Sequence, residues 1–150
     1  MSITVRRYGD WDKCRRVLVG LDVRIQREVD KEAKKQAQQL AKAIQQGIRS
    51  QSFPMAPLSQ DYAEQKAAEG KDGRTLIATG RYVNSIGAWK ESEGTWRVGI
   101  QDSAMEQLGQ WLEYGTRNMP ARPHFRVAGE LAKRELQAGF QGALRRAVRV

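Results

Sequence analysis

The chain has 150 residues, of which 40% are hydrophobic and 29% are charged. That length and apolar content suit one folded domain over residues 1–150 and exclude a wholly disordered chain. No apolar run approaches the ~20 residues that span a bilayer, and the first residues lack the apolar stretch of a secretion signal. We therefore expect a cytoplasmic protein without a membrane contact.

The charge is unevenly distributed along the chain. The net charge is +9, with +6 over residues 1–50, −2 over 51–120 and +5 over 121–150. Two basic ends therefore flank a mildly acidic middle. Such a field attracts polyanions, but it equally suits an acidic patch on another protein.

The residue types that usually perform catalysis are scarce. Cys14 is the only cysteine and His124 the only histidine, so the sequence offers neither a thiolate metal cluster nor a paired histidine. No glycine-rich phosphate loop or nucleophile motif occurs. We interpret His124 as a surface or packing residue and Cys14 as a small buried hydrophobe. We expect no enzyme activity, no cofactor and no metal site.

The first third of the chain is predicted to be helical. Asp10–Val19 is predicted to form a short helix that Gly20 interrupts, and Asp22 is predicted to cap a long helix that ends near Ser50. Its ~27 residues would span about 40 Å, which is about the diameter of a compact globule of this length. We therefore expect either an elongated molecule or a helix that rests partly on another chain. Its apolar residues recur every three or four positions: Ile25, Val29, Ala33, Ala37, Leu40, Ile44 and Ile48. Its acidic residues are expected to pair with lysines one turn away: Glu28, Asp30 and Glu32.

The segment after the long helix, "SFPMAPLSQ", contains two prolines and is predicted to be extended. Ser59 is then a candidate cap for a short helix that runs through Ala68. Thr79 is a candidate cap for one or two helical turns over Gly80–Ile86.

The stretch "GAWKESEGTWRVGI" (87–100) has the alternating pattern of a β-hairpin. Trp96, Val98 and Ile100 alternate with small or polar residues after a Glu-Gly turn, so we expect these three side chains to face the core. A small antiparallel sheet packed by a long N-terminal helix and a C-terminal helix predicts an α+β fold.

Two further helices are predicted after the hairpin. Asp102 or Ser103 caps the first, and Gly115 ends it in the left-handed conformation. Its apolar face comprises Met105, Leu108, Trp111 and Leu112. The apolar face of the second comprises Phe125, Ala128, Leu131, Ala132, Leu136, Phe140, Leu144 and Val148. Its glycines at positions 129, 139 and 142 each cost about 1 kcal/mol relative to Ala, so we expect this helix to fray before its end.

The segment "EYGTRNMPARP" (113–123), which we call the strap, connects these two helices. Each residue before its two prolines is biased toward extended geometry, so the strap is stiff and would lose little entropy when a partner docks on it. Arg117 and Arg122 are expected to project from it, with Glu113 as a candidate local partner. The alternative is a connector that only aims the last helix into the core.

Several stretches resemble a known family in their order and spacing. They are "LIATGRYVNSIG" (76–87), a hairpin with "WRVGI", and "LEYGTRNMPARPHFRVAGE" (112–130). The pattern resembles the tail-completion and minor tail proteins of lambda-like and related tailed phages and prophages, in which a long N-terminal helix comes first. The matching residues are Thr79, Gly80, Ser85, Ile86, Glu113, Tyr114, Gly115, Thr116, Met119, Pro120, Ala121, Arg122, Pro123 and Phe125.

The resemblance covers residues 57–130, because "PLSQDYAEQK" (57–66) is similar to a stretch of the Mu-like virion morphogenesis relatives. Residues 1–50 would form an N-terminal helical arm and 131–150 a C-terminal helix with a basic tail. The sequence departs from the family pattern at two positions. His124 stands between Pro123 and Phe125, where the family usually runs Pro-Phe directly, and Tyr82 stands where Leu is usual.

The resemblance implies a structural protein of the head–tail neck, assembled in a bacterial cytoplasm and located in the virion. Family members form rings, often hexameric, and contact connector, neck or tail proteins. The strap would then be a docking surface for a neighbouring subunit or ring, and the long helix would find its additional partner in the next subunit. The implied docking residues are Glu113, Tyr114, Gly115, Thr116, Arg117, Met119, Pro120, Arg122, Pro123 and Phe125.

The alternative function is a nucleic-acid-binding module that uses the basic ends. Arg145, Arg146 and Arg149 form a basic tail, although they suit acidic protein partners equally well. No surface of interleaved aromatic and basic residues is evident. We therefore expect only weak, non-specific DNA binding that declines steeply with salt.

Overall fold

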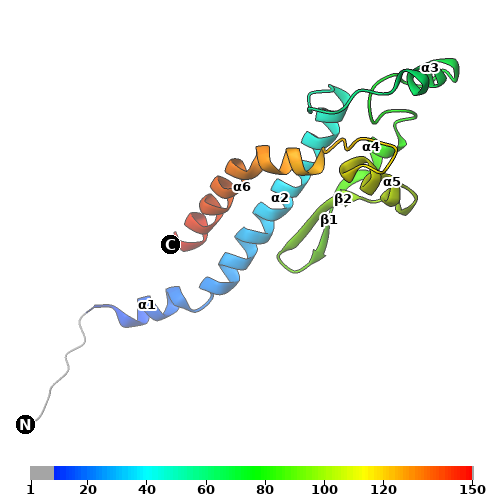
Figure 1. Cartoon of the computed structure of the whole chain (residues 1–150). Helices are drawn as coiled ribbons and strands as arrows, with labels where there is room; N and C mark the ends of the chain where they lie inside the picture. The colour runs from blue at the N-terminus through cyan, green and yellow to red at the C-terminus, as the bar shows by residue number, and fades with distance from the viewer. Residues whose placement is uncertain (1–8, 150) are drawn as a thin grey trace, which may run out of the picture.

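The computed structural model describes residues 9–149, which form an elongated α+β fold (Figure 1). Its elements in chain order are α1 (Trp11–Leu18), α2 (Leu21–Arg49), α3 (Gln60–Ala68), α4 (Arg81–Ser85), β1 (Ile86–Ser92), β2 (Thr95–Ile100), α5 (Ser103–Tyr114) and α6 (Phe125–Val148). Within the described part of the chain, no helix combines the length and apolar character that a membrane span needs.

Helix α1 forms where it was predicted, but it packs against little. Asp10 caps it by accepting a hydrogen bond from the backbone N–H of Lys13 at 2.9 Å. None of its residues is buried. Cys14 is exposed, so the interpretation of this residue as a buried hydrophobe is wrong.

Helix α2 is the longest element, and its apolar periodicity predicted its buried face. The expected face is confirmed, with burial increasing from the half-buried Ile25 to the fully buried Ile48. The predicted cap is wrong. Gly20, with a φ of 93°, occupies the N-cap position, and Asp22 lies in the first helical turn. There its carboxylate interacts favourably with the helix dipole instead of capping a free N–H.

The hairpin packs along α2 and confirms the predicted alternation. Strands β1 and β2 pair antiparallel, with Ile86 opposite Ile100. At the base of the hairpin, Gln45 Nε2 donates to the Ile86 carbonyl at 2.7 Å, and near its turn Trp96 Nε1 donates to Asp30 at 3.2 Å. Trp96, Val98 and Ile100 are half-buried, whereas Thr95 and Arg97 are exposed.

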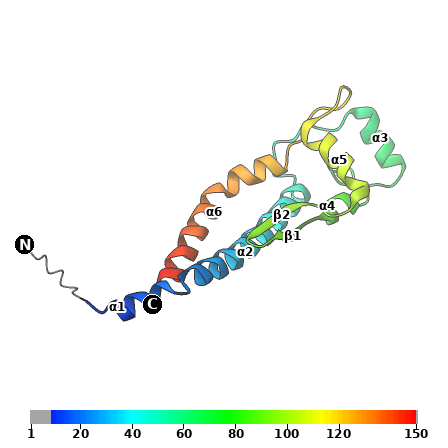
Figure 2. The same cartoon turned by 90° about the horizontal axis from the view of Figure 1, so that it is seen from below.

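Helix α6 runs back alongside α2 (Figures 1 and 2). It continues to Val148, so the expected fraying does not occur. The predicted apolar face is only partly correct, because Leu131, Leu144 and Val148 are exposed. The residues buried in this helix are small: Ala128, Ala143 and Ala147.

Close packing against α2 explains why α6 contains a glycine at position 139, although glycine has a low helix propensity. A Cβ built at this position would lie 2.6 Å from Glu32 Oε1 and in still closer contact with Gln36, both on α2. Small residues let two helices approach closely, as alanine does at positions 143 and 147. Gly139 therefore contributes to the packing of α6 on α2.

The acidic residues of α2 find long-range partners instead of the expected lysines one turn away. Arg146 of α6 donates to Glu28 at 3.0 Å and to Glu32 at 2.9 Å. Asp30 accepts a hydrogen bond from Lys90 of the hairpin at 3.1 Å. A local pair is present only between Glu32 and Lys35, at 3.7 Å, within the described residues. These carboxylates connect α2 to α6 and to the hairpin.

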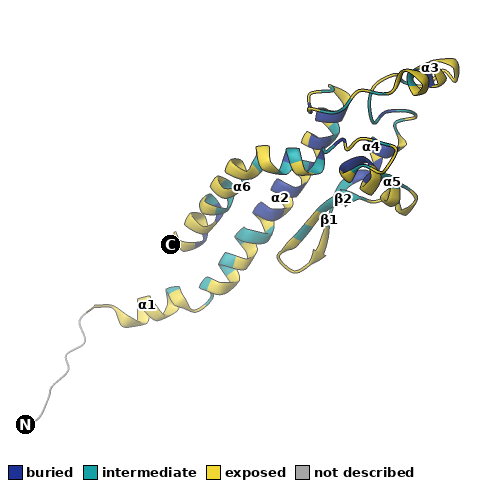
Figure 3. Cartoon of the chain, in the orientation of Figure 1, coloured by how far each residue is buried: buried dark blue, intermediate teal, exposed yellow. Residues whose placement is uncertain are grey.

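The core lies at the C-terminal end of α2 (Figure 3). Its buried residues are Ile44, Ile48, Phe53, Ile77, Tyr82, Val83, Ile86, Leu112 and Ala128. Helix α4 contributes two of them. Its N-cap position is occupied by Gly80, not by Thr79 as predicted, although the Thr79 hydroxyl accepts a long hydrogen bond from the N–H of Arg81 at 3.4 Å.

Helices α3 and α5 complete the end of the molecule that contains the core. Ser59 precedes α3 as predicted, but its side chain makes no capping hydrogen bond. Asp102 caps α5 by accepting from the N–H of Ala104 at 3.0 Å. The predicted face of α5 is confirmed at Leu112, which is buried, and is wrong at Trp111, which is 47% exposed.

Candidate functional site: the strap and the groove beside it

The strap is a closed loop held by its own backbone. Gly115 ends α5 as predicted, and its N–H donates to the Trp111 carbonyl at 2.8 Å. Its φ of 78° is positive, but its ψ of 176° is extended, so the predicted left-handed helical conformation is wrong. Thr116 and Met119 then exchange two backbone hydrogen bonds at 2.8 and 3.3 Å. The N–H of Arg122 returns to the Leu112 carbonyl at 2.7 Å. The strap therefore closes on the helix from which it starts.

Glu113 joins the two helices that the strap connects. One of its carboxylate oxygens, Oε2, accepts the backbone N–H groups of His124 at 2.8 Å and Phe125 at 3.1 Å. The other, Oε1, accepts the N–H of Arg126 at 2.9 Å. Three of the free N–H groups at the start of α6 are thus satisfied by a side chain of α5, in place of a conventional cap.

Because it caps α6, Glu113 is buried and does not pair with Arg117 or Arg122, so that expectation is wrong. Burial alone would raise the pKa of its carboxyl. The three backbone N–H groups outweigh burial and hold the pKa of Glu113 below its ordinary value. The carboxylate is therefore charged at neutral pH and complements the positive end of the α6 dipole.

His124 lies at the centre of this junction with an exposed fraction of 0%. Its Nδ1 lies 2.9 Å from the Arg122 carbonyl oxygen, and its Nε2 lies 2.6 Å from the Tyr82 hydroxyl. A carbonyl can only accept, so Nδ1 carries the proton and Nε2 accepts from Tyr82. Burial lowers the pKa of His124 and raises that of Tyr82. Of the two roles that the sequence left open for His124, a surface or a packing residue, the structure shows the packing role.

His124 and Tyr82 are also the two departures from the family pattern that the sequence resembles. They contact each other in the fold, through the hydrogen bond and through an edge-to-face ring contact with centroids 5.6 Å apart. Phe125 still packs against the core, next to the His124 ring at 4.8 Å between centroids.

A glutamate, a histidine and a tyrosine in contact could suggest proton transfer. Here His124 is closed off from solvent, and both carboxylate oxygens of Glu113 accept backbone N–H groups. The polar atoms of these side chains are occupied in joining α4, α5 and α6. We interpret the cluster as a structural lock.

Arg122 is buried, which contradicts the expectation that it projects from the strap. Only 6% of its surface is exposed. Its Nε donates to the Ala56 carbonyl at 2.8 Å and its Nη2 to the Pro57 carbonyl at 2.9 Å. The planar guanidinium therefore clamps the extended segment before α3 onto the strap.

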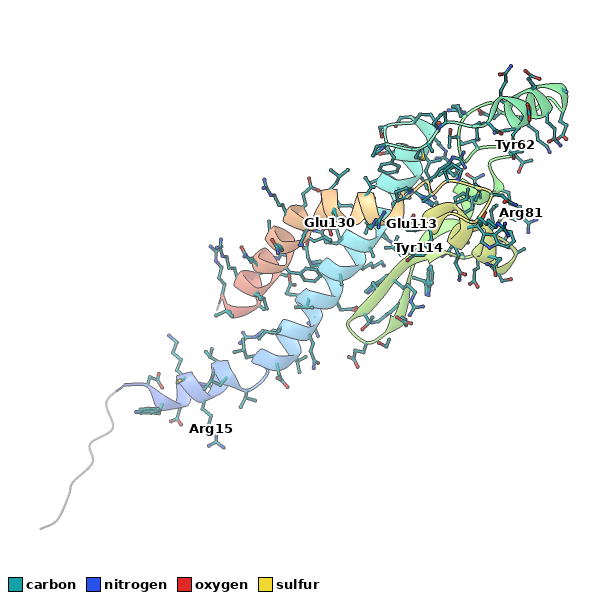
Figure 4. All side chains as sticks on the ribbon, in the orientation of Figure 1. Arg15, Tyr62, Arg81, Glu113, Tyr114 and Glu130 are labelled. Carbon is teal, nitrogen blue, oxygen red and sulfur yellow. The ribbon has the colours of Figure 1, made fainter. Side chains whose placement is uncertain are left out.

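The outward side of the strap is formed by other residues. Tyr114 is 78% exposed (Figure 4), and Thr116, Arg117 and Pro120 are exposed as well. Met119, Pro123 and Phe125 are half-buried, and Met119 and Phe125 pack against the core. Trp111, which the sequence interpretation assigned to the core, is exposed one turn before Tyr114 on the same helix. Because residues three positions apart lie on the same side of a helix, the spacing of Trp111 and Tyr114 could have predicted that they share an outer face.

A groove of about 940 Å³ lies beside the strap. It is mostly apolar, and its walls come from α3, the extended segment 56–59, residues 76–82, α5 and the strap. Lys66 lines it but directs its ammonium to the carbonyls of Arg74 and Ile77, at 3.0 and 2.5 Å. Burial lowers the pKa of Lys66. The groove is not predictable from the sequence, because its walls come from parts of the chain that are far apart in sequence.

One wall of the groove is conformationally strained. Leu76 has a φ of 63°, a region that bulky residues rarely adopt. Such strain often occurs where a fold shapes a binding surface. Leu76 nonetheless packs against the core, so the surrounding contacts hold it in place.

The predicted basic tail is divided by the structure. Arg146 is paired with Glu28 and Glu32, whereas Arg145 and Arg149 are exposed.

Comparison of the chain with protein-family models, with curated proteins and with solved structures finds no significant match.

Proposed function

We propose that the protein is a structural component of a tailed-phage or prophage particle. In this proposal it acts at the head–tail neck, in tail completion or head–tail joining, through protein–protein contacts and without catalysis. The observation that supports it is the strap. Glu113, Gly115 and Arg122 belong to the motif that resembles the phage family, and each has a defined task in building the strap.

The strap suits a docking role because its backbone is already fixed. The lock beneath it leaves little chain entropy to lose on binding. Its outward residues, Trp111, Tyr114 and Arg117, are of the types that dominate binding energies in protein interfaces. We propose that this face contacts a neighbouring copy or an adjoining neck or tail protein, within a ring in the virion.

Electron microscopy of particles made without this protein tests the proposal. Filled heads and separate tails are expected, and complementation with the wild-type gene should restore joined particles. Normal infectious particles would contradict the assignment to the neck.

A second assay tests the docking face in the same particles. Tyr114→Ala combined with Arg117→Ala should reduce the yield of joined particles, although the protein melts at an unchanged temperature, because exposed residues contribute little to stability. Arg134→Ala, at an exposed position on α6, is the control and should join normally. Normal joining by the double variant would contradict the docking role and indicate that the strap only connects α5 to α6.

The exposed Arg145 and Arg149 keep a weak DNA contact as the second candidate function. Anisotropy of labelled duplexes should detect only non-specific binding that declines steeply between low and physiological salt, because bound counterions are released. A sequence-specific, nanomolar complex at physiological salt would favour the nucleic-acid-binding function over the structural one.

A further inference from the structure

The groove beside the strap combines an apolar lining with an excess of positive charge. Its charged lining residues are Lys66, Arg81 and Arg122, and none of the residues that line it is acidic. Arg81 is exposed and forms an ion pair with Asp102 at 2.8 Å, so its charge is compensated. The other two cations are buried, with 2% of Lys66 and 6% of Arg122 exposed. The excess charge is therefore that of two buried side chains.

Neither buried cation has a carboxylate partner in the part of the chain that the structure describes. Lys66 and Arg122 each donate to two backbone carbonyls. Burial lowers the pKa of Lys66 more than the charge of Asp72 raises it, and Arg74 already binds that carboxylate at 2.6 Å. Carbonyls satisfy the donors but carry no net charge, whereas a buried charge is usually balanced by one of opposite sign. An anionic group at the groove would supply that balance.

The groove also has unused hydrogen-bond donors on its lining residues. The backbone N–H groups of Ala56 and Leu58, in the extended segment, donate to no backbone carbonyl within residues 9–149. The same holds for Ala78 and Thr79. An extended peptide can accept such hydrogen bonds with its own carbonyl oxygens, as a strand does when it is added to the edge of a sheet. The donors of the groove thus match a peptide backbone, and its cations match acidic side chains.

The exposed apolar surfaces of α1 and α6 in a second copy are poor occupants, because they would add positive charge. Helix α1 exposes Trp11 and Leu18 beside three cations and one carboxylate. In the last turns of α6, Leu144 and Val148 stand next to two exposed arginines. The charge of the groove therefore favours a segment of another protein.

We propose that the groove binds an extended segment of another protein in which aspartate or glutamate alternates with apolar residues. Alternation places the two kinds of side chain on opposite faces of an extended chain. One face would pack on apolar residues such as Leu76 and Leu108, while the carboxylates lie near Lys66 and Arg122. The inference rests on the protein–protein part of the proposed function and deepens it by naming the chemistry of one partner. It needs no phage component, so it is tested on the purified protein.

Selection from a display library of short random peptides tests the chemistry of the occupant. With the purified protein as bait, the enriched sequences are expected to combine aspartate or glutamate with apolar residues. Enrichment of basic or purely apolar sequences would overturn the proposal, and so would a library from which nothing is enriched.

The leading peptide is then made in three versions, with its acidic residues kept, replaced by their amides, or replaced by lysine. Fluorescence anisotropy should show the affinity falling in that order, by roughly tenfold from the acidic to the amide version. Equal affinities of the three versions would mean that the charge of the groove has no role in binding.

Methionine methyl NMR locates the peptide on the full chain. Met105 and Met119 line the groove, whereas Met55 packs against the core and does not line it. The acidic peptide should shift the methyl signals of Met105 and Met119 and leave that of Met55 in place. A bound peptide that moves neither groove methionine would contradict the proposed site.

Matched charge variants separate the local charge of the groove from the net charge of the protein. Ser59 and Asn118 line the groove and are exposed, so Ser59→Asp combined with Asn118→Asp should leave the melting temperature nearly unchanged. This variant should bind the acidic peptide about tenfold more weakly or worse, and the lysine version better than the wild type does. Gln107→Glu with Gln110→Glu makes the same change in net charge at exposed positions of α5 that do not line the groove, and should bind normally. Equal weakening by the two pairs would refute a site in the groove.

A second copy as the occupant is a separate outcome of these tests. It would appear in sedimentation velocity as self-association that the acidic peptide competes away, and it would overturn the proposal of another protein. None of these results affects the assignment to the neck, which rests on the appearance of particles made without the protein. Conversely, normal particles made without it would leave a confirmed peptide site intact.

Discussion

The two ends of the molecule differ in how their polar and apolar groups are used. The core end is formed by α4, α5, the strap and the base of the hairpin. It turns charged groups inward, where Glu113 and Arg122 bind backbone atoms. The arm, formed by α1 and the neighbouring ends of α2 and α6, leaves apolar groups outside. Val23, Leu144 and Val148 are exposed there together with the face of α1. Buried polar groups hold the core end together, whereas the arm rests on few buried groups and leaves several apolar side chains exposed.

The largest effect is expected from a substitution that breaks the structural lock at the core end. Glu113→Ala should lower the free energy of unfolding by about 3–4 kcal/mol, because it leaves three backbone N–H groups without an acceptor at a buried helix start. Urea denaturation measures the loss. Glu113→Gln keeps one acceptor oxygen and should lose less. A loss below about 1 kcal/mol would show that water can replace the cap.

The next effect concerns the turn that closes the strap. Gly115→Val should cost about 2–3 kcal/mol, since a Cβ there would lie 2.8 Å from Ala121 N and 2.9 Å from Met119 O at a positive φ. Thermal unfolding measures it. Gly129→Ala is the matched control, because a Cβ at that helical position meets nothing within 4 Å. The control should be neutral or stabilising by up to about 1 kcal/mol.

Arg122→Ala should cost about 2 kcal/mol, since charge-assisted hydrogen bonds to two carbonyls are lost. The same substitution at Arg117, an exposed residue of the same strap, should change stability by no more than about 0.5 kcal/mol. Denaturant midpoints of the two variants distinguish an inward from an outward arginine. Equal midpoints would contradict the burial of Arg122.

The pH dependence of stability should follow from His124. Its pKa in the folded protein is below the ordinary 6.5, so the unfolded chain binds more protons as the pH falls below about 6.5. Stability should therefore decline from pH 7 to pH 5, by at most about 1.4 kcal/mol per pH unit for one imidazole. The lowered pKa of Glu113 adds a further loss at lower pH, as that carboxylate is protonated.

Urea midpoints across this pH range provide the measurement. His124→Gln should flatten the decline between pH 7 and pH 5 while leaving the loss at lower pH in place. If the variant and the wild type declined in parallel, another group would be responsible.

The smallest effect is expected in the arm. Trp11→Glu should change the free energy of unfolding by no more than about 0.5 kcal/mol, because Trp11 is exposed and α1 contains no buried residue. Urea denaturation measures this difference. A loss of more than about 1 kcal/mol would show that Trp11 packs against the rest of the folded chain.

Local patterns in the sequence were sufficient to predict the elements. The three-or-four-residue spacing from Ile25 to Ile48 predicted α2, the alternation from Trp96 to Ile100 predicted the second strand, and Gly115 was predicted to end α5. These features depend on neighbours within a few positions, so the chain encodes them locally. The α+β fold class followed from their order.

The direction of the polar side chains was decided only by the tertiary structure. Glu113 was expected to pair with an arginine of the strap, yet it caps a helix that begins twelve residues later, and Arg122 faces a segment sixty-five residues earlier in the chain. Likewise, Ala143 and Ala147 are buried, whereas Leu144 is exposed. The hydrogen bond from Arg146 to Glu32 and the close approach at Gly139 determine which side of α6 faces α2. These contacts depend on which segments lie close together in the folded chain, and the periodicity of the sequence does not determine that.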